Sequence, residues 1–227
     1  MVRIFLIGSV GSGKSTLCEA FRQAGFSDVY DERNVLSTFP DKLPDINNPL
    51  ISMGHAGHVL AVNFGHLLSR LFDERKTLPY ASCRDVVCVH ARSILDELYL
   101  FREASWECDE VFDHLGRTAL VTLFDPRTDV FVRLESLPAK CTERVEERAL
   151  ESTYPNEFFT RQDVAVKHLR NVIERTLFYD GGVEPKHFHV LDLPVDVLCE
   201  PENSEDSITV SPRELVSQIL AWLKQVV

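Results

Sequence analysis

Eight residues near the start of the chain combine glycines with a lysine and a serine in a spacing suited to holding phosphate. Residues 8–15 are Gly-Ser-Val-Gly-Ser-Gly-Lys-Ser, which fits the pattern G-x-x-x-x-G-K-[ST]. In such a loop the backbone N–H groups point at phosphate oxygens, and the following helix adds the positive end of its dipole. Lys14 is expected to reach the outer phosphates, and the Ser15 hydroxyl is expected to bind Mg²⁺. The residues predicted to hold a nucleotide's phosphate tail are Gly8, Ser9, Val10, Gly11, Ser12, Gly13, Lys14, Ser15 and Thr16.

A loop of this kind needs a buried strand before it and a helix after it. The run 2–7 is almost wholly apolar, which predicts the strand. Residues 16–22 continue with apolar side chains at helical spacing, and Gly25 is a plausible end of the helix. The sequence therefore predicts a strand, a phosphate-binding turn and a helix in direct succession.

Further segments alternate between strand and helix patterns along the whole chain. This alternation predicts an α/β fold with a parallel, doubly wound sheet flanked by helices. No long linker or internal repeat divides the sequence, so we expect one domain over residues 1–227. Strands are expected at 27–30, 85–90, 129–134 and 187–192, and helices at 55–76, 94–104, 108–116, 161–178 and 212–227, with 119–124 as a helix end or a strand and 37–54 as a connecting loop.

Charge and composition exclude several classes of function. The formal net charge of −11 disfavours a nucleic acid partner, because the phosphate backbone attracts basic surfaces. No apolar run is long enough to span a membrane. The six cysteines include no C-x-x-C pair, so we expect reduced thiols and a cytoplasmic location.

Charged side chains follow three of the predicted strands. Ligands of a parallel sheet bind outside the carboxyl ends of its strands, so Lys14, Glu32 and Arg92 are expected to converge. A carboxylate beside the phosphates can accept a proton from an attacking hydroxyl, which makes Glu32 the leading general base and Asp31 its rival. Arg92 is expected to offset the charge that develops on a transferred group.

At this point the residues resemble a known family, the deoxynucleoside kinases related to deoxycytidine, deoxyguanosine and non-zinc thymidine kinases. The likeness covers most of the chain. Residues 5–17 are similar to the family's phosphate loop, and Asp31-Glu32 stands where the family has its Glu-Pro base. Residues 91–93, Ala-Arg-Ser, stand where it has Glu-Arg-Ser or Asp-Arg-Ser.

Further matches follow in order along the chain. Asn63 and Arg70 resemble the family's glutamine and arginine that bind and position the nucleobase. Residues 141–148 resemble a helical lid that closes over the phosphates, within a lid of about 141–155. Glu151 is similar in place to the carboxylate that meets the sugar 3′-hydroxyl, and 155–159 resemble the family's Pro-x-Glu-Tyr-Leu helix. The lid arginines that the resemblance assigns to the phosphates are Arg144 and Arg148.

The resemblance implies a P-loop kinase fold with a helical lid and an ATP-dependent kinase that uses Mg²⁺. Such an enzyme transfers the γ-phosphate of ATP to the 5′-hydroxyl of a deoxynucleoside, and the resemblance also implies a homodimer. Altered motifs suggest a divergent member of viral type: Ala91 replaces an acidic residue near Mg²⁺, with Glu32 and Asp85 as substitutes, and Arg33 replaces a proline.

Other interpretations of the same residues stay open. A nucleoside monophosphate kinase of the thymidylate type could use Arg70 and Arg92 to clamp the acceptor's phosphate. A nucleotide-binding regulatory ATPase would need the phosphate loop but no acceptor pocket. Arg144 and Arg148 also fit a solvated helix whose arginines pair with neighbouring glutamates.

Overall fold

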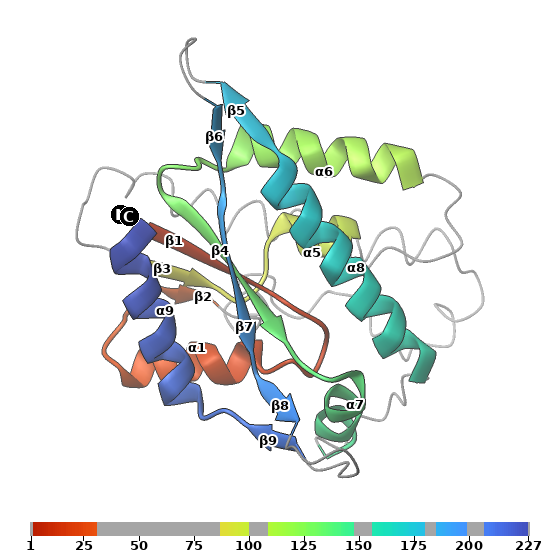
Figure 1. Cartoon of the computed structure of the whole chain (residues 1–227), viewed down its shortest axis with the longest axis vertical. Helices are drawn as coiled ribbons and strands as arrows, with labels where there is room; N and C mark the ends of the chain where they lie inside the picture. The colour runs from red at the N-terminus through yellow and green to blue at the C-terminus, as the bar shows by residue number, and fades with distance from the viewer. Residues whose placement is uncertain are drawn as a thin grey trace, which may run out of the picture.

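A parallel five-stranded sheet forms the centre of the molecule (Figure 1). The computed structural model describes residues 2–30, 87–99, 109–147, 156–179, 185–198 and 207–226. The strand order is β2-β3-β1-β4-β7, and every neighbouring pair is parallel, as the alternating pattern predicts. The strands are β1 (Val2–Ile7), β2 (Val29–Tyr30), β3 (Val87–His90), β4 (Asp129–Glu135) and β7 (His189–Pro194).

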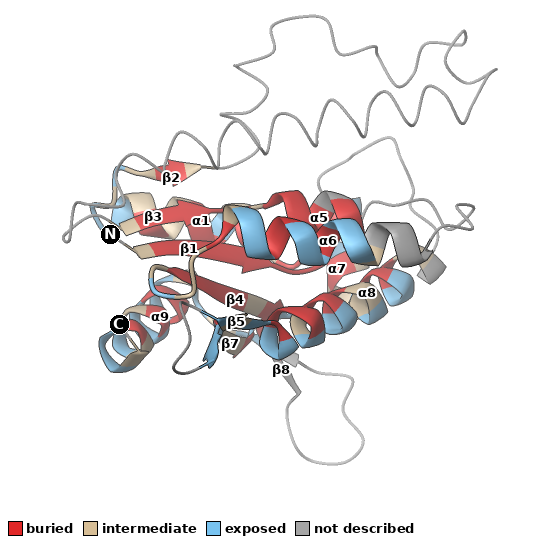
Figure 2. Ribbon diagram, turned by 90° about the horizontal axis from the view of Figure 1, so that it is seen from above, coloured by how far each residue is buried: buried red, intermediate tan, exposed pale blue. Residues whose placement is uncertain are grey.

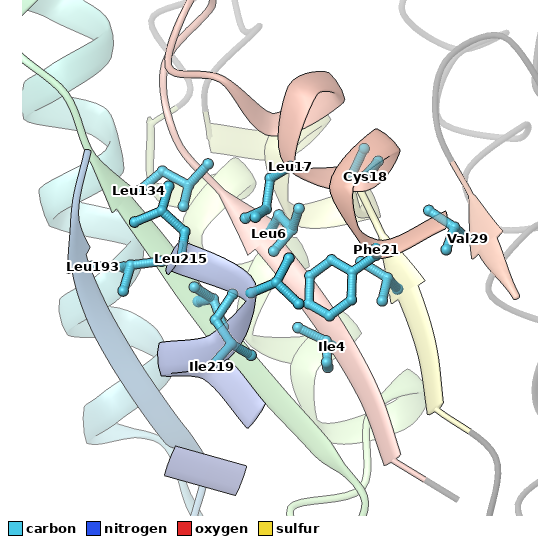
Figure 3. Packing of buried hydrophobic residues seen from close by; sticks show 14 of the residues in the cluster. Ile4, Leu6, Leu17, Cys18, Phe21, Val29, Leu134, Leu193, Leu215 and Ile219 are labelled. Atoms are coloured by element: carbon cyan, nitrogen blue, oxygen red, sulfur yellow. The ribbon is translucent and has the colours of Figure 1, made fainter. Parts of the chain in front are cut away.

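Helices cover both faces of this sheet because its central strand is apolar on both sides. Successive side chains of a strand point to opposite faces. Ile4 and Leu6 pack with α1 (Lys14–Gln23) and α9 (Pro212–Val226), as Figure 3 shows. Phe5 and Ile7 pack on the other face, with α5 (Ile94–Tyr99), α6 (Asp109–Leu123) and α8 (Asn156–Arg175). β1 is therefore buried along most of its length (Figure 2), and it carries the loop at its carboxyl end.

The smaller elements lie around the ends of the sheet. α7 (Pro138–Glu146) follows β4, and two antiparallel hairpins pair β5 (Leu177–Tyr179) with β6 (Pro185–His187) and β8 (Asp196–Leu198) with β9 (Ser207–Thr209). None of the described helices has the length and apolar character needed to cross a lipid bilayer.

Several predicted boundaries were wrong. The helix expected at 161–178 begins at Asn156 and ends at Arg175, and residues 177–179 form β5. The reason is that the helical spacing of buried side chains gives way to the alternation of a strand after Arg175. Leu177 and Tyr179 are exposed, whereas the Phe178 ring between them packs edge-on against the Phe188 ring, with 4.8 Å between the ring centroids. The helix predicted at 108–116 continues to Leu123, so the alternative strand at 119–124 is wrong. The predicted helix at 55–76 and the loop at 37–54 lie outside the described residues.

A buried ion pair joins β1 to β4 at the end of the sheet away from the loop. The side chains of Arg3 and Asp129 are 2% and 0% exposed, and both oxygens of the carboxylate accept hydrogen bonds from the guanidinium. Arg3 also donates to the Leu123 carbonyl at 3.1 Å, and Asp129 accepts from the Asp125 N–H at 2.8 Å. The pair therefore ties the end of α6 and the turn after it to the sheet.

Replacing one member of this pair should destabilise the protein strongly. Arg3→Met leaves the Asp129 carboxylate buried without its cation, which we expect to lower the free energy of unfolding by about 3–5 kcal/mol. The matched control is Arg127→Met, because the Arg127–Asp125 pair is exposed on the same turn. Its loss should cost less than about 1 kcal/mol. Urea unfolding of the two variants measures both values, and equal losses would contradict this account of β1.

Candidate functional site

The loop between β1 and α1 has the backbone conformation that its glycines permit. Gly11 and Gly13 adopt positive φ angles of 79° and 94°, a region that other residues rarely enter. A Cβ atom on Gly11 would lie 2.5 Å from the carbonyl oxygen of Cys141 in α7, so that helix packs directly on the loop. α1 begins at Lys14, and its first turn therefore presents backbone N–H groups at the loop.

Lys14 lies inside the loop. The side chain is buried, and its ammonium group donates hydrogen bonds to the carbonyl oxygens of Gly8 and Ser9, the latter at 2.8 Å. The Ser12 hydroxyl lies 3.4 Å from the same nitrogen. A buried ammonium needs such partners. The sequence pattern assigns this ammonium to the outer phosphates of a nucleotide.

The tip of the loop is held by α7 and α8. The Val10 side chain packs against a small cluster formed by Cys141, Val145 and Phe159. The Val10 N–H donates a hydrogen bond of 2.7 Å to the side-chain oxygen of Gln162 in α8. Burial raises the pKa of the Cys141 thiol, although Ser136, Arg144 and Lys14 act in the opposite direction, so this cysteine is a protonated core residue.

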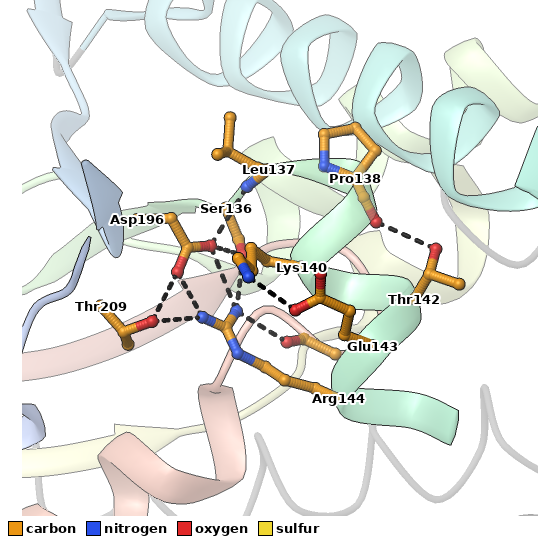
Figure 4. A network of polar contacts seen from close by, with 10 residues as sticks. Ser136, Leu137, Pro138, Lys140, Thr142, Glu143, Arg144, Asp196 and Thr209 are labelled. Carbon is orange, nitrogen blue, oxygen red and sulfur yellow. Dashed lines mark hydrogen bonds and ion pairs between the residues drawn. The ribbon is translucent and has the colours of Figure 1, made fainter. Parts of the chain in front are cut away.

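Arg144 of α7 lies beside the loop within a network of polar contacts (Figure 4). Its guanidinium pairs with both carboxylate oxygens of Asp196 in β8 and donates to the Ser136 hydroxyl at 2.7 Å. It also lies 3.1 Å from the Thr209 hydroxyl and 3.3 Å from the Gly11 carbonyl oxygen. Arg144 thus joins α7, the β8–β9 hairpin and the loop between β1 and α1.

Asp196 is the centre of this network, and the sequence interpretation did not include it. Its side chain is fully buried and also accepts hydrogen bonds from the Ser136 hydroxyl and the Leu137 N–H. Burial alone would raise the pKa of Asp196, but hydrogen bonds from Arg144 and Ser136 and the charge of Arg144 outweigh it and hold the pKa below its ordinary value. A signal was available, since Asp196 follows the last strand of the sheet just as Arg92 follows β3.

A pocket opens beside the loop, between the start of α1 and the start of α9. Its walls are mainly apolar, and Arg144 is also among the residues that line it. A mainly apolar pocket beside this loop can receive an apolar part of a ligand whose phosphates bind the loop. The residues that line it are Ser12, Gly13, Thr16, Leu17, Leu134, Arg144, Val195, Thr209, Val210, Pro212 and Leu215.

The structure places Arg92 at the same edge of the sheet as the loop. Arg92 follows β3, which pairs in parallel with β1, so both strands end toward the same side. Ser93 is fully buried, and its hydroxyl accepts a hydrogen bond from the Leu95 N–H at 3.1 Å, which caps α5. Arg92 itself is partly exposed between a buried Ala91 and this cap.

Several predicted site residues cannot be placed beside these. β2 ends at Tyr30 at the same edge of the sheet, next to β3, and the residues that follow it are outside the description. The predicted site residues that lie outside the described residues are Glu32, Asn63, Arg70, Arg148 and Glu151, together with the alternatives Asp31 and Asp85.

The described residues fit a magnesium ion that arrives with a nucleotide. Among them, no cluster of three His, Cys, Asp or Glu side chains is arranged to hold a metal. Mg²⁺ in phosphate-transfer sites keeps several waters and is held by a few protein groups together with phosphate oxygens. The partly exposed Ser15 hydroxyl, in the first turn of α1, is placed to supply one such group.

Comparison with known proteins identifies the fold. No model of a known protein family matches the sequence, and no curated protein does so either. Among solved structures, the chain is similar to deoxyadenosine kinase from M. mycoides with bound dATP, with a TM-score of 0.57, 16% identity and coverage of 98% of this chain and 100% of that one. The structure of the same enzyme with dCMP and dCDP gives a TM-score of 0.52 at 14% identity, over 99% and 100% of the two chains.

Shikimate kinase from Acinetobacter baumannii in complex with shikimate is also similar, with a TM-score of 0.53 and 11% identity over 99% of this chain and 94% of that one. The chain therefore has the fold of the P-loop kinases, a mostly parallel sheet flanked by helices. This confirms the predicted fold class.

The Asp196 carboxylate should give the protein a measurable dependence of stability on pH. Its pKa is lower in the folded chain than the unfolded value of about 3.9, so ionisation stabilises the fold above that pH, and this contribution is lost as the pH falls through the folded-state pKa. We expect Asp196→Asn to lower the free energy of unfolding by about 3 kcal/mol near neutral pH and by progressively less below about pH 4.

Urea unfolding of the parent and Asp196→Asn across this pH range measures the difference. Asp163→Asn is the control, because its pair with Lys167 lies on the surface of α8. A difference that stays constant with pH would show that the charge of Asp196 is not what holds Arg144.

Proposed function

We propose that the protein is an ATP-dependent kinase that phosphorylates the 5′-hydroxyl of a deoxynucleoside. The observation that carries this proposal is the buried Lys14 ammonium inside a glycine-formed cradle at the carboxyl end of the central strand. The fold shared with deoxyadenosine kinase supports the acceptor class, because in that protein the same architecture binds deoxynucleotides. The negative charge of the chain as a whole agrees with a small substrate rather than a nucleic acid.

The donor nucleotide would occupy the loop and the pocket beside it. Its phosphates would contact the amides of residues 11–16 and the ammonium of Lys14, and its base would enter the apolar pocket. Arg144, oriented by Asp196 beside Gly11 of the loop, would contact the phosphates. When bound, Mg²⁺ would neutralise the developing charge on the phosphates.

The acceptor would approach from the ends of β2 and β3. Its 5′-hydroxyl oxygen would form a bond to the γ-phosphorus while the bond from that phosphorus to the bridging oxygen of ADP breaks. The hydroxyl proton would pass to Glu32, and Arg92 would stabilise the transferred group. Asn63, Arg70 and Glu151 are proposed to orient the nucleoside, Arg148 to contact the phosphates, and a homodimer in the cytoplasm is proposed as the working form.

A coupled assay for ADP release tests the proposal. The full-length protein is incubated with ATP, Mg²⁺ and each of the four common deoxynucleosides, then with the matching monophosphates, and then with no acceptor. Turnover with a deoxynucleoside supports the proposal. Turnover with monophosphates alone would identify a thymidylate-type kinase, and acceptor-independent hydrolysis would identify a regulatory ATPase.

Removal of the Lys14 charge should abolish phosphoryl transfer. Lys14→Ala takes away the cation that the loop holds against the outer phosphates, and we expect activity to fall by at least about a thousandfold. Lys167→Ala removes an exposed lysine of α8 and should leave the rate unchanged. Steady-state rates of the two variants decide the point, and substantial turnover by Lys14→Ala would rule out the loop as the phosphate site.

Glu32→Gln tests the proposed general base. The amide keeps the shape of the side chain but cannot accept the proton, so kcat should fall roughly 10²- to 10⁴-fold while the KM for ATP stays close to that of the parent. Asp31→Asn is the matched variant and should have a small effect. The reverse result would make Asp31 the base.

A further inference from the structure

Gln162 is a buried amide on a helix face that is otherwise apolar. Its side chain points from α8 toward the loop, and the residue is 2% exposed. The neighbouring positions on the same face, Phe159, Val166 and Leu169, are all buried and apolar. Spacing of three and four residues puts these side chains on one stripe, where a further apolar residue would be expected.

Burying an amide on this stripe is unfavourable unless its hydrogen bonds are made. The Gln162 oxygen accepts the 2.7 Å bond from the Val10 N–H. The Gln162 nitrogen is buried and has no hydrogen-bond partner within the part of the chain that the structure describes. Burying the Gln162 amide therefore lowers stability, and the hydrogen bond that it makes is the one from the Val10 N–H at the tip of the loop.

That contact fixes the orientation of one peptide plane. In the trans Ser9–Val10 peptide, the N–H and the C=O lie in the peptide plane and point in opposite directions. Because Gln162 holds the Val10 N–H toward α8, the Ser9 carbonyl is turned into the loop. There it accepts hydrogen bonds from the Lys14 ammonium at 2.8 Å and from the Ser12 N–H at 3.2 Å.

Rotation of the Ser9–Val10 peptide would turn the Ser9 carbonyl away from the loop. Lys14 would then lose one of its acceptors, and the hydrogen bond from the Ser12 N–H to the Ser9 carbonyl would break. The Val10 N–H would also be left without its partner in a largely apolar contact with α7 and α8. The Val10 N–H donates to Gln162, so it does not donate to a phosphate oxygen. The Val10 amide therefore stabilises the loop, and the backbone amides after it would bind the phosphates of the nucleotide.

We propose that Gln162 is a positioning residue for nucleotide binding, which acts on Lys14 through the Ser9–Val10 peptide plane. This inference rests on the proposed function, since it assumes that Lys14 and the loop bind a nucleotide. It couples the loop to α8, the helix that follows the predicted lid, by a hydrogen bond between residues far apart in sequence.

Three variants of the full chain test the proposal, with MgADP as the probe. Gln162→Met keeps the volume of the side chain and removes the acceptor. Gln162→Glu keeps an acceptor oxygen at the same place. Thr176→Val removes a buried hydrogen bond at the far end of α8, from the Thr176 hydroxyl to the Val172 carbonyl at 2.7 Å, and controls for general destabilisation of that helix.

The measurements are MgADP affinity by calorimetry, thermal stability, and hydrogen exchange at the Val10 amide. Gln162→Met should weaken MgADP binding roughly ten- to a hundredfold, the factor expected when one buried donor loses its partner, and should speed exchange at Val10. Gln162→Glu should keep Val10 protected and bind MgADP more tightly than Gln162→Met. Thr176→Val should lower thermal stability without changing affinity.

Each other outcome overturns the inference. If Gln162→Met binds MgADP as the parent does, Gln162 is a packing residue only. If Thr176→Val loses affinity to the same extent, the effect is one of helix stability. If the parent itself binds no MgADP, the proposed function fails first, which separates the two failures. Should Gln162→Met not fold, Gln162→Asn, which withdraws the oxygen by one methylene, takes its place with the same expectation.

Discussion

A lysine ammonium held inside a turn of main chain is the constraint on which the rest of this structure depends. Burying the charge of Lys14 requires acceptors on several sides, and the carbonyls of Gly8 and Ser9 supply them. Those carbonyls point inward only if the loop curves tightly, which the positive φ angles at Gly11 and Gly13 permit. The glycines, the lysine and the strand before them thus form one unit.

The surrounding elements contact this unit from outside. α7 packs on Gly11 so closely that a methyl group there would meet its backbone. The Asp196 carboxylate holds Arg144 beside Gly11, and Gln162 of α8 holds the Ser9–Val10 peptide. The parallel sheet brings these groups together, because β1, β3, β4 and β7 all end at one edge. Support of this kind agrees with the proposed phosphoryl transfer, which depends on positioning.

The sequence predicts the parts of this site that follow local rules. The motif at residues 8–15 locates the loop, and helical spacing after it predicts α1. The helix expected at 212–227 is α9, and in the structure the Ser211 hydroxyl caps it by accepting a hydrogen bond from the Glu214 N–H at 3.2 Å. The parallel pairing of all five strands agrees with the doubly wound sheet that the alternation of strand and helix patterns predicts.

Other parts of the site could not be predicted in this way. The place of Asp196 after the last strand marks it as a candidate site residue, but its partner is not predictable. Asp196 pairs with Arg144, 52 residues away, and Gln162 contacts Val10, 152 residues away, and no periodicity in the sequence reports such separations. Helical spacing places Gln162 on an otherwise apolar stripe of α8, but it does not show which backbone group the amide contacts. The short strands β5, β8 and β9 have three residues each, too few for an alternating pattern to emerge.

The most direct test of the central claim is an amide NMR titration of the full chain with MgADP. The account predicts that the amide resonances of residues 11–16 shift most, and that the Val10 amide remains hydrogen-bonded to Gln162. Shifts centred on another surface, or no shifts at millimolar MgADP, would contradict it.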